Sequence, residues 1–303
     1  MCIRDSLGEN GFLPVRISGK KLEFGCHQFD RASAQVKSAM LLASTSGAKQ
    51  SITLPVGSRD HTENILPHLG YDVDTHLSNL ETVSAVLTKP VSVLHEYTVP
   101  TDPSAMIFWL IVLPILPSKK MKFKSVLRNP TRTRYLNILE QLGYSFEWKN
   151  THDSHGESRG DISATYHNQG AVDEGPIQVD GKWCIDEIPA LSAIATVAGK
   201  TLLFQNVEEL KLKESNRLDK TIELVRIFGA EAVYENQSLR VVGRLLMNSE
   251  AVFASLGDHR LVMSYIMLCF ASNSKNKVDS LGAHKVSYPQ FMFELKKLGV
   301  TID

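Results

Sequence analysis

Cysteine is scarce in this chain of 303 residues, and its four copies, Cys2, Cys26, Cys184 and Cys269, lie far apart without a C-x-x-C pair. This spacing excludes the disulfide framework of a small secreted domain, and it gives no zinc knuckle. The N-terminus also lacks the apolar segment of a secretory signal peptide. Scattered, reduced thiols are typical of the cytoplasm, so we expect a cytoplasmic protein.

The sequence has neither an excess of one charge nor a long hydrophobic segment. Lysine plus arginine number 33, as do aspartate plus glutamate, so the net charge gives no argument for a nucleic-acid partner. The longest apolar run, Met106–Leu116, is too short to span a bilayer and contains Pro114, so we expect a buried helix and no membrane partner. With 43% hydrophobic and 22% charged residues, the chain is an ordinary globular one, long enough for two domains.

What the sequence does contain is an internal repeat. In four places a predicted amphipathic helix ends in a large apolar residue and a glycine, and a predicted strand follows: Leu69-Gly70-Tyr71, Leu142-Gly143-Tyr144, Phe228-Gly229-Ala230 and Leu298-Gly299-Val300. The glycines are 70 to 86 residues apart, which is the size of a supersecondary repeat. Each glycine suits the position after a helix, where a left-handed backbone costs it little.

Each repeat also contains an earlier helix that is rich in small and aliphatic residues and opens on a polar residue. These helices are predicted at Ser33–Ser44, Ser104–Leu113, Asp186–Ala198 and Asp258–Ala271. Their near-continuous apolarity predicts burial on most sides, and helix capping explains each polar start taken alone. If the helices pack in parallel, however, their positive dipole ends lie in one region suited to an anionic ligand.

Strands are predicted between these helices, at Pro14–Ile17, Ser51–Leu54, Val91–Tyr97, Gln178–Val179, Thr201–Phe204, Leu239–Val242 and Lys277–Val278. The alternation predicts an α/β or α+β fold built from pseudo-repeats. The passage Glu96–Pro103 contains two prolines and no helical period, so we predict a domain crossing near residue 100, with domains 1–100 and 101–303. Clustered His, Gly, Ser and Asp residues predict a surface loop over Asn150–Asp161.

Five short polar segments are candidates for chemistry. They are SAQVKSA (Ser33–Ala39), SRDHTE (Ser58–Glu63), IDEIP (Ile185–Pro189), KESNRL (Lys213–Leu218) and DHR (Asp258–Arg260). Capping and helix-surface ion pairs explain each segment taken alone. A carboxylate partly removed from water can nevertheless act as a base, and guanidinium groups can bind carboxylate or phosphate.

In this order, the five segments resemble the motifs of the 5-enolpyruvylshikimate-3-phosphate synthases, and KESNRL followed by DHR is the most specific pair. The resemblance covers residues 7 to 303. It implies two lobes of repeated β-α-β-α-β-β units, an inside-out α/β barrel, with the first lobe incomplete in this chain. It also implies transfer of the enolpyruvyl group of phosphoenolpyruvate to the 5-hydroxyl of shikimate 3-phosphate, with release of phosphate, in chorismate and aromatic amino acid biosynthesis.

The resemblance further implies a role for each matching residue. Asp186 would accept the 5-hydroxyl proton, Lys213 would contact the same oxygen, and Glu214 would exchange protons at the methylene carbon of phosphoenolpyruvate. The two binding sets would be Ser33, Ala34, Gln35, Ser58, Asp186 and Lys213 for shikimate 3-phosphate, and Gln35, Arg217 and Arg260 for phosphoenolpyruvate. No metal or other cofactor is required by this scheme. The expected partners are therefore two anionic small molecules, bound by a monomer.

Some family features are missing. The Lys-Ser and Asn-Ala-Gly-Thr segments that open the family's chains are absent, and Met1–Ser6 matches nothing, so we expect an N-terminally truncated copy that is inactive alone. A degenerate paralogue that binds ligand without turnover is a second hypothesis. An enolpyruvyl transferase acting on a UDP-amino sugar is a third, although those enzymes lack the KESNRL and DHR pair. Whether His61 or Lys285 contacts substrate is left open.

Overall fold

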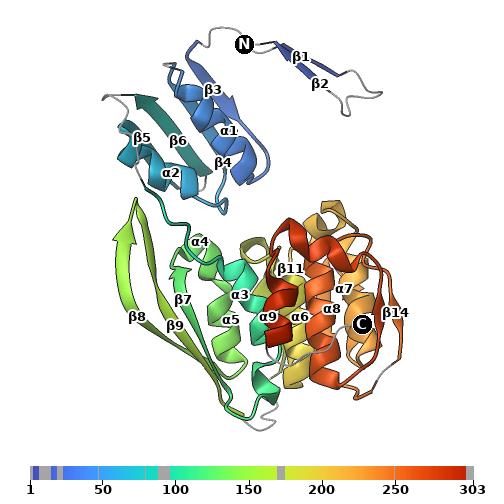
Figure 1. Cartoon of the computed structure of the whole chain (residues 1–303). Coiled ribbons are helices and arrows are strands. Elements are labelled where there is room, and N and C mark those ends of the chain that lie inside the picture. Colours follow the sequence, from blue (N-terminus) through green and yellow to red (C-terminus); the bar gives the residue numbers. More distant parts are fainter. Residues whose placement is uncertain are drawn as a thin grey trace. The chain divides into compact units, whose positions relative to one another are not determined.

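The structure is a computed structural model that describes residues 3–6, 15–18, 23–46, 48–78, 80–87, 96–168, 175–248 and 250–297. The chain divides into two compact units (Figure 1). Unit 1 comprises residues 1–99 together with 153–157, and unit 2 comprises residues 100–152 and 158–303. No helix within the described ranges has both the length and the apolar character needed to cross a membrane.

Unit 1 contains one complete β-α-β-α-β-β repeat. Its elements are β3 (Gly25–Gln28), α1 (Ala34–Ser44), β4 (Gln50–Pro55), α2 (His61–Ile65) with η2 (Leu66–Leu69), β5 (Tyr71–Leu77) and β6 (Leu80–Leu87). The sheet order is β3-β4-β6-β5, with β3 parallel to β4 and the other pairs antiparallel. Before this repeat, β1 (Ile3–Ser6) pairs antiparallel with β2 (Val15–Ser18).

Unit 2 contains the same topology a second time. Its elements are β10 (Ile177–Asp180), η4 (Gly181–Trp183), α6 (Ile188–Ala198), β11 (Thr201–Gln205), η5 (Glu208–Leu212), α7 (Arg217–Ile227), β12 (Glu231–Glu235) and β13 (Ser238–Val242). The sheet order is β10-β11-β13-β12, again with one parallel pair, β10 and β11, followed by antiparallel pairs. The repeated unit expected from the resemblance is therefore present twice.

Parts of two further repeats flank this sheet in the sequence. The first contains α3 (Pro103–Leu110), η3 (Leu113–Ile115), β7 (Lys120–Leu127), α4 (Pro130–Thr133), α5 (Tyr135–Gln141), β8 (Tyr144–Ser154) and β9 (Glu157–Tyr166), in the sheet order β7-β9-β8. The second contains β14 (Val252–Phe253), α8 (His259–Ser272), β15 (Lys277–Val278), η6 (Leu281–Val286) and α9 (Phe291–Lys297), with β14 parallel to β15.

The repeat glycines have the conformation that the sequence predicts. Gly70, Gly143 and Gly229 have φ angles of 91°, 94° and 93°, in the left-handed region that a glycine enters at little cost. A strand begins directly or one residue after each of them. The fourth predicted glycine, Gly299, lies outside the described residues. So does most of the predicted strand Val91–Tyr97, and its described end has no regular structure.

The predicted loop over Asn150–Asp161 is wrong, because these residues form the turn end of a β-ribbon made by β8 and β9. His155 and Gly156 at its turn have φ angles of 54° and 82°, and two consecutive left-handed residues are what a tight hairpin turn requires. The outer half of β8 is exposed. Polar residues on such a strand have the same composition as a loop, which explains the error.

Three of the four predicted buried helices pack together. In unit 2, α6 packs against α8, and α3 packs against both (Figure 1). Nearly all their residues are buried, as predicted. The prediction is wrong for α1, whose buried residues are Lys37, Leu41 and Ser44, while Leu42 is 56% exposed. Within the described part of unit 1, α1 packs against β4 and β6, and its Ser38 hydroxyl lies 2.6 Å from the Thr62 hydroxyl of α2.

Candidate active site

The N-termini of α3, α6 and α8 meet in one cluster. The Ser104 hydroxyl, in the first turn of α3, donates to Glu187 Oε1 at 2.6 Å, just before α6. Arg260, in the first turn of α8, donates from Nη1 to the Asp186 carbonyl oxygen at 2.9 Å. The same Arg260 nitrogen lies 3.6 Å from Glu187 Oε1. The parallel packing considered from the sequence is therefore present for these three helices, and their positive dipole ends share one region.

The polar residues at these helix starts do not all act as caps. Asp258 caps α8, since its Oδ1 accepts from the Arg260 backbone N–H at 3.0 Å. Asp102 rather than Ser104 caps α3, accepting from the Ser104 N–H at 2.9 Å. Glu187 occupies the cap position of α6 but makes no side-chain cap hydrogen bond. Capping thus leaves the two carboxylates before α6 unexplained, and they face arginine side chains instead.

Arg217, the first residue of α7, lies at the centre of the cluster. Its side chain is fully buried, and each of its nitrogens meets a different carboxylate. Nε donates to Asp258 Oδ2 at 2.8 Å, Nη1 lies 3.3 Å from Asp186 Oδ1, and Nη2 pairs with Glu214. A buried guanidinium requires such complete pairing, because leaving its charge unpaired out of water costs several kcal/mol.

Asp186 is the partly exposed carboxylate of the cluster, with 22% of its side chain accessible. Besides Arg217, it lies 3.6 Å from Lys213 Nζ and 3.8 Å from Arg260 Nη2. Lys213 also pairs with Glu209 at 2.5 Å. The structure therefore brings together the unit 2 residues that the sequence indicated, namely Asp186, Lys213, Glu214, Arg217, Asp258 and Arg260.

The charges in the cluster shift the protonation of its members. Burial opposes the charge of Arg260, but the carboxylates around it, led by Glu187 and Asp186, raise the pKa of its guanidinium above the ordinary value. Burial, and next the adjacent positive charge of Arg260, lower the pKa of His259 below its ordinary 6.5, so its imidazole is neutral at pH 7. The cluster therefore offers fixed cations beside a neutral histidine.

Sequence reasoning missed two members of this cluster, Arg132 and Glu187. Arg132 of α4 donates from Nη2 to Asp102 and, at 3.2 Å, to the Ser104 hydroxyl. Nothing in the local sequence around Arg132 indicates this contact, since its partners lie about 30 residues away. Glu187 was visible as the second of two adjacent carboxylates in IDEIP. A capping explanation was sufficient for it until the structure showed no cap.

In unit 1, three of the residues assigned to shikimate 3-phosphate, Ser33, Ala34 and Gln35, lie at the start of α1. The Ser33 hydroxyl accepts from the Val36 N–H at 3.3 Å and lies 3.4 Å from Gln35 Oε1. Ala34 and Gln35 occupy the first two helical positions, where backbone N–H groups have no partner within the helix. This position can present N–H groups and the Gln35 amide to an anion, and the ligand contact itself stays a prediction.

Ser58 is oriented inward. It is 8% exposed, and its hydroxyl donates to Glu81 Oε2 at 3.1 Å. A hydroxyl has one proton, so Ser58 can donate to a phosphate only if it leaves Glu81. His61 Nδ1 lies 2.5 Å from Glu157 Oε1, also within unit 1. Lys285 is exposed in η6.

A buried ion network that the sequence did not reveal supports this part of unit 1. Lys37 is fully buried, and its Nζ lies 2.5 Å from Glu63 Oε1 and 2.8 Å from Glu81 Oε1. Two buried carboxylates share one ammonium, so the network carries an excess negative charge when both are ionised. Burial raises the pKa of Glu63, and the opposing effect of Lys37 does not cancel it. Lys37, Leu41 and Ser44 are the buried residues of α1 and recur at the spacing of one helix face. The position of Lys37 on this face is the signal that the sequence offers.

Comparison with known proteins shows which family this chain matches. The model of the EPSP synthase family, 3-phosphoshikimate 1-carboxyvinyltransferase, matches residues 5–295. The chain is 33% identical to the 3-phosphoshikimate 1-carboxyvinyltransferase of Wolinella succinogenes, over 97% of this chain and 66% of that protein. It is 32% identical to that of Bacillus subtilis, over 95% of this chain and 66% of the relative. The chain thus spans 66% of the length of these curated relatives.

Solved structures agree with the α/β fold class. EPSP synthase from Acinetobacter baumannii superimposes with a TM-score of 0.82 at 28% identity, covering 100% of this chain and 68% of that one. The enolpyruvyl transferase NikO from Streptomyces tendae gives a TM-score of 0.63 at 14% identity, covering 100% and 69%, and shares the fold alone. Because the family model matches residues 5–295, which is nearly the whole of this chain, the chain belongs to the EPSP synthase family.

Proposed function

We propose that the protein carrying this chain transfers the enolpyruvyl group of phosphoenolpyruvate to the 5-hydroxyl of shikimate 3-phosphate and releases phosphate. The observation that carries the proposal is the cluster at the N-termini of α3, α6 and α8, where Asp186 lies within 3.8 Å of Lys213, Arg217 and Arg260. Family membership supports the identity of the substrates. The proposal concerns the complete protein, because the chain spans 66% of its relatives' length.

The reaction needs a base, an acid and several cations. A C–O bond forms between the 5-oxygen and the central carbon of phosphoenolpyruvate, while the methylene carbon gains a proton. We assign removal of the 5-hydroxyl proton to Asp186 and proton exchange at the methylene carbon to Glu214. Lys213 would contact the 5-oxygen. The C–O bond to phosphate then breaks, and the carbon proton is removed again. Cations that are fixed before reaction stabilise the anionic intermediate.

The pairing of Glu214 with Arg217 suggests how the acid becomes available. Glu214 is 56% exposed and contacts Nη2 of the fully buried Arg217, whose other nitrogens hold Asp258 and Asp186. We propose that the carboxylate of phosphoenolpyruvate replaces Glu214 on Arg217, since both are carboxylates and a guanidinium edge holds one at a time. Substrate binding would then free Glu214 beside the methylene carbon. Arg260 would bind the phosphate of the same substrate.

We propose that unit 1 supplies the shikimate 3-phosphate contacts, through Ser33, Ala34, Gln35 and Ser58. The free N–H groups in the first turn of α1 support this assignment, because they suit a phosphate. For Ser58 the assignment requires its hydroxyl to turn away from Glu81. We further propose that the protein acts as a cytoplasmic monomer, which size-exclusion chromatography with light scattering tests.

The test is a coupled phosphate-release assay on the complete gene product that contains this chain. We expect phosphate release that requires both phosphoenolpyruvate and shikimate 3-phosphate. Glu214→Gln should lower kcat by about 10² or more, the usual scale for an acid–base group. Glu223→Gln is the matched control, since Glu223 is a partly exposed acid of α7 paired with Lys220 at 2.7 Å.

Three outcomes would count against the proposal. Phosphate release without shikimate 3-phosphate would indicate hydrolysis rather than transfer. Binding of both substrates without any release would favour a non-catalytic paralogue. Full activity of Glu214→Gln would remove Glu214 from the chemistry, while leaving Asp186 to be tested by Asp186→Asn.

A further inference from the structure

The turn of the β8–β9 ribbon belongs to unit 1, although most of the two strands belongs to unit 2. Residues 153–157, which we call the ribbon tip, form part of unit 1, whereas residues 100–152 and those from 158 onward form unit 2. A hairpin turn is ordinarily a solvated surface segment. The place of this turn in unit 1 therefore depends on contacts that the tip itself makes.

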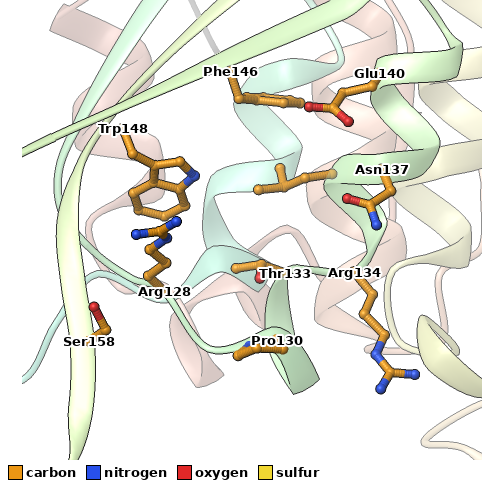
Figure 2. Close-up of a pocket in the computed structure, with 10 residues that line it drawn as sticks. Arg128, Pro130, Thr133, Arg134, Asn137, Glu140, Phe146, Trp148 and Ser158 are labelled. Atoms are coloured by element: carbon orange, nitrogen blue, oxygen red, sulfur yellow. The ribbon is translucent and has the colours of Figure 1, made fainter. Parts of the chain in front are cut away.

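The base of the ribbon is anchored within unit 2. Phe146 and Trp148 of β8 and Ser158 of β9 line a pocket of about 480 Å³, whose other walls come mainly from α4 and α5 (Figure 2). The Arg128 backbone N–H donates to the Ser158 carbonyl oxygen at 2.8 Å, and the Arg128 guanidinium lies 5.6 Å from the centroid of the Trp148 ring. Since Ser158 directly follows the tip, the tip extends from a fixed point of the fold.

Side chains of the tip contact α2, η2 and the segment before Pro100. His61 Nδ1, in the first turn of α2, donates to Glu157 Oε1 at 2.5 Å. The His155 ring lies edge-on to the His68 ring of η2, with the centroids 6.1 Å apart, and 5.2 Å from the Tyr97 ring centroid. His61 and His68 are seven residues apart, the spacing at which residues share one face of a helix. The tip therefore meets α2 and η2 along one face.

The closest approach is between backbones. A Cβ atom at Gly156 would lie 2.1 Å from the backbone oxygen of Asn64 in α2 and 3.0 Å from His68 Nε2. Gly156 also has a φ of 82°, in the left-handed region. Glycine thus meets two requirements here, the conformation of the turn and the approach of two backbones. A larger residue would push the tip away from α2.

Glu157 is largely removed from water, with 11% of its side chain exposed. Burial of a carboxylate is unfavourable unless a partner compensates for the lost hydration. His61 provides a hydrogen bond to it. The tip is therefore built for contact with unit 1 rather than for exposure to solvent.

The helix that the tip contacts depends on its neighbours for stability. With five residues, His61–Ile65, α2 is too short to be stable in isolation. Its inward side is held by α1, because Glu63 Oε1 lies 2.5 Å from Lys37 Nζ. The tip holds a different face. Ser58, which we assign to shikimate 3-phosphate, precedes the first residue of α2 by three positions, so a shift of α2 displaces the segment that carries it.

We propose that the ribbon tip is a positioning element for shikimate 3-phosphate, because it holds α2 and thereby the segment that carries Ser58. Glu157 is the positioning residue and acts through His61, while Gly156 permits the close approach. The identity of the ligand rests on the proposed function. The docking of the tip on α2 stands on its own contacts.

The first experiment measures docking without any ligand, by hydrogen exchange of the α2 and η2 amides in the complete protein. Gly156→Ala should make these amides exchange at least about tenfold faster, because the clash with Asn64 favours local opening. Gly199→Ala is the matched control. Gly199 also has a left-handed φ, of 65°, but a Cβ there meets no atom within 4 Å. This control should leave exchange in α2 and η2 unchanged.

The second experiment measures binding by calorimetric titration with shikimate 3-phosphate alone. Glu157→Ala should raise its Kd by about fivefold, the scale of one hydrogen bond. Glu157→Gln keeps an oxygen that can accept from His61 and should recover most of the affinity. KM for phosphoenolpyruvate should change much less, because Arg217 and Arg260 lie in unit 2. Glu147→Ala, an exposed acid of β8 outside the tip, is the control and should bind as the wild type does.

Two results would overturn the inference. Equal α2 and η2 exchange in Gly156→Ala, Glu157→Ala and the wild type would show that the tip does not hold the helix. Faster exchange in these variants with an unchanged Kd for shikimate 3-phosphate would show that the docking serves stability alone. A wild-type protein that does not bind shikimate 3-phosphate would refute the proposed function instead, and the exchange comparison would still decide whether the tip holds α2.

Discussion

Glu187 Oε1 lies 3.6 Å from Arg260 Nη1 and joins the start of α6 to the first turn of α8. The same oxygen accepts the Ser104 hydroxyl from α3 at 2.6 Å. Glu187 is buried, so its charge is balanced by these partners rather than by water. The contact fixes Arg260, the residue that we assign to the phosphate of phosphoenolpyruvate. It uses only some of the N–H donors of the Arg260 guanidinium.

The first prediction is that Glu187 is a positioning residue for Arg260. Glu187→Gln keeps the shape of the side chain and an acceptor for Ser104 but loses the charge that holds Arg260. We expect KM for phosphoenolpyruvate to rise by about tenfold while kcat changes much less, as for an interaction that serves binding. Steady-state kinetics of the complete protein measure both constants. Glu231→Gln, at an exposed position of β12, is the control, and an unchanged KM in Glu187→Gln would contradict the prediction.

The second prediction concerns Arg217 as the charge that stabilises the cluster. Arg217→Met removes a fully buried guanidinium and leaves Asp258, which is also fully buried, without its ion-pair partner. We expect unit 2 to lose about 3–5 kcal/mol in its free energy of unfolding, the usual cost of removing one partner of a buried pair.

Urea unfolding followed by tryptophan fluorescence measures this loss, because Trp109, Trp148 and Trp183 all lie in unit 2. Arg240→Met, at an exposed position of β13, should change the free energy by no more than about 0.5 kcal/mol. If the two variants unfold at the same urea concentration, the ion pairs of Arg217 contribute nothing measurable to stability.

The third prediction tests the repeat glycines through Gly143. Its φ is 94°, and a Cβ atom there would lie 2.7 Å from the backbone oxygen of His167. Gly143→Ala should therefore destabilise unit 2 by about 1–3 kcal/mol, the usual cost of a strained backbone position. Gly282→Ala is the control, because a Cβ there meets no atom within 4 Å and no left-handed φ is required. Equal thermal midpoints for the two variants would show that the chain relaxes around Gly143 at no cost.

The same glycines show what could be predicted from the sequence. A left-handed residue after a helix strongly favours glycine, so Gly70, Gly143 and Gly229 locate helix ends and strand starts in the sequence itself. The cap of α8 at Asp258 was equally local. Buried helices were predictable where apolar residues cover every face, and α1 shows the limit, because its exposure depends on what packs against it.

Contacts between distant segments could not be predicted in this way. Lys37 and Glu81 are 44 residues apart, and no local period links a lysine on one helix to a glutamate on a strand. Arg132 reaches Asp102 from another helix, again without a motif. For the candidate site, the motif residues were predictable as a set from the sequence. The partners that orient them became apparent only in the structure.

The last prediction concerns the buried network of Lys37, Glu63 and Glu81. Burial raises the pKa of Glu63 above its ordinary 4.5 in the folded state. The folded chain therefore holds this proton more tightly than the unfolded chain does. As the pH rises from 4.5 through the folded-state pKa, the free energy of unfolding of unit 1 should decrease, by at most about 1.4 kcal/mol per pH unit. Glu63→Gln has no such proton to lose, and this contribution to the pH dependence should vanish.

The measurement is hydrogen exchange of the β4 and β6 amides in the full chain, corrected for the intrinsic pH dependence of exchange. These strands form the centre of the unit 1 sheet, so their slowest amides report its free energy of opening. Asp74→Asn, at an exposed position of β5, is the control and should keep the wild-type slope. If Glu63→Gln shows that slope as well, another group is responsible, and Glu63 stays ionised beside Lys37 throughout the range. A flat profile in Glu63→Gln alone would assign the titration to Glu63, because Lys37 and Glu81 remain in place in that variant.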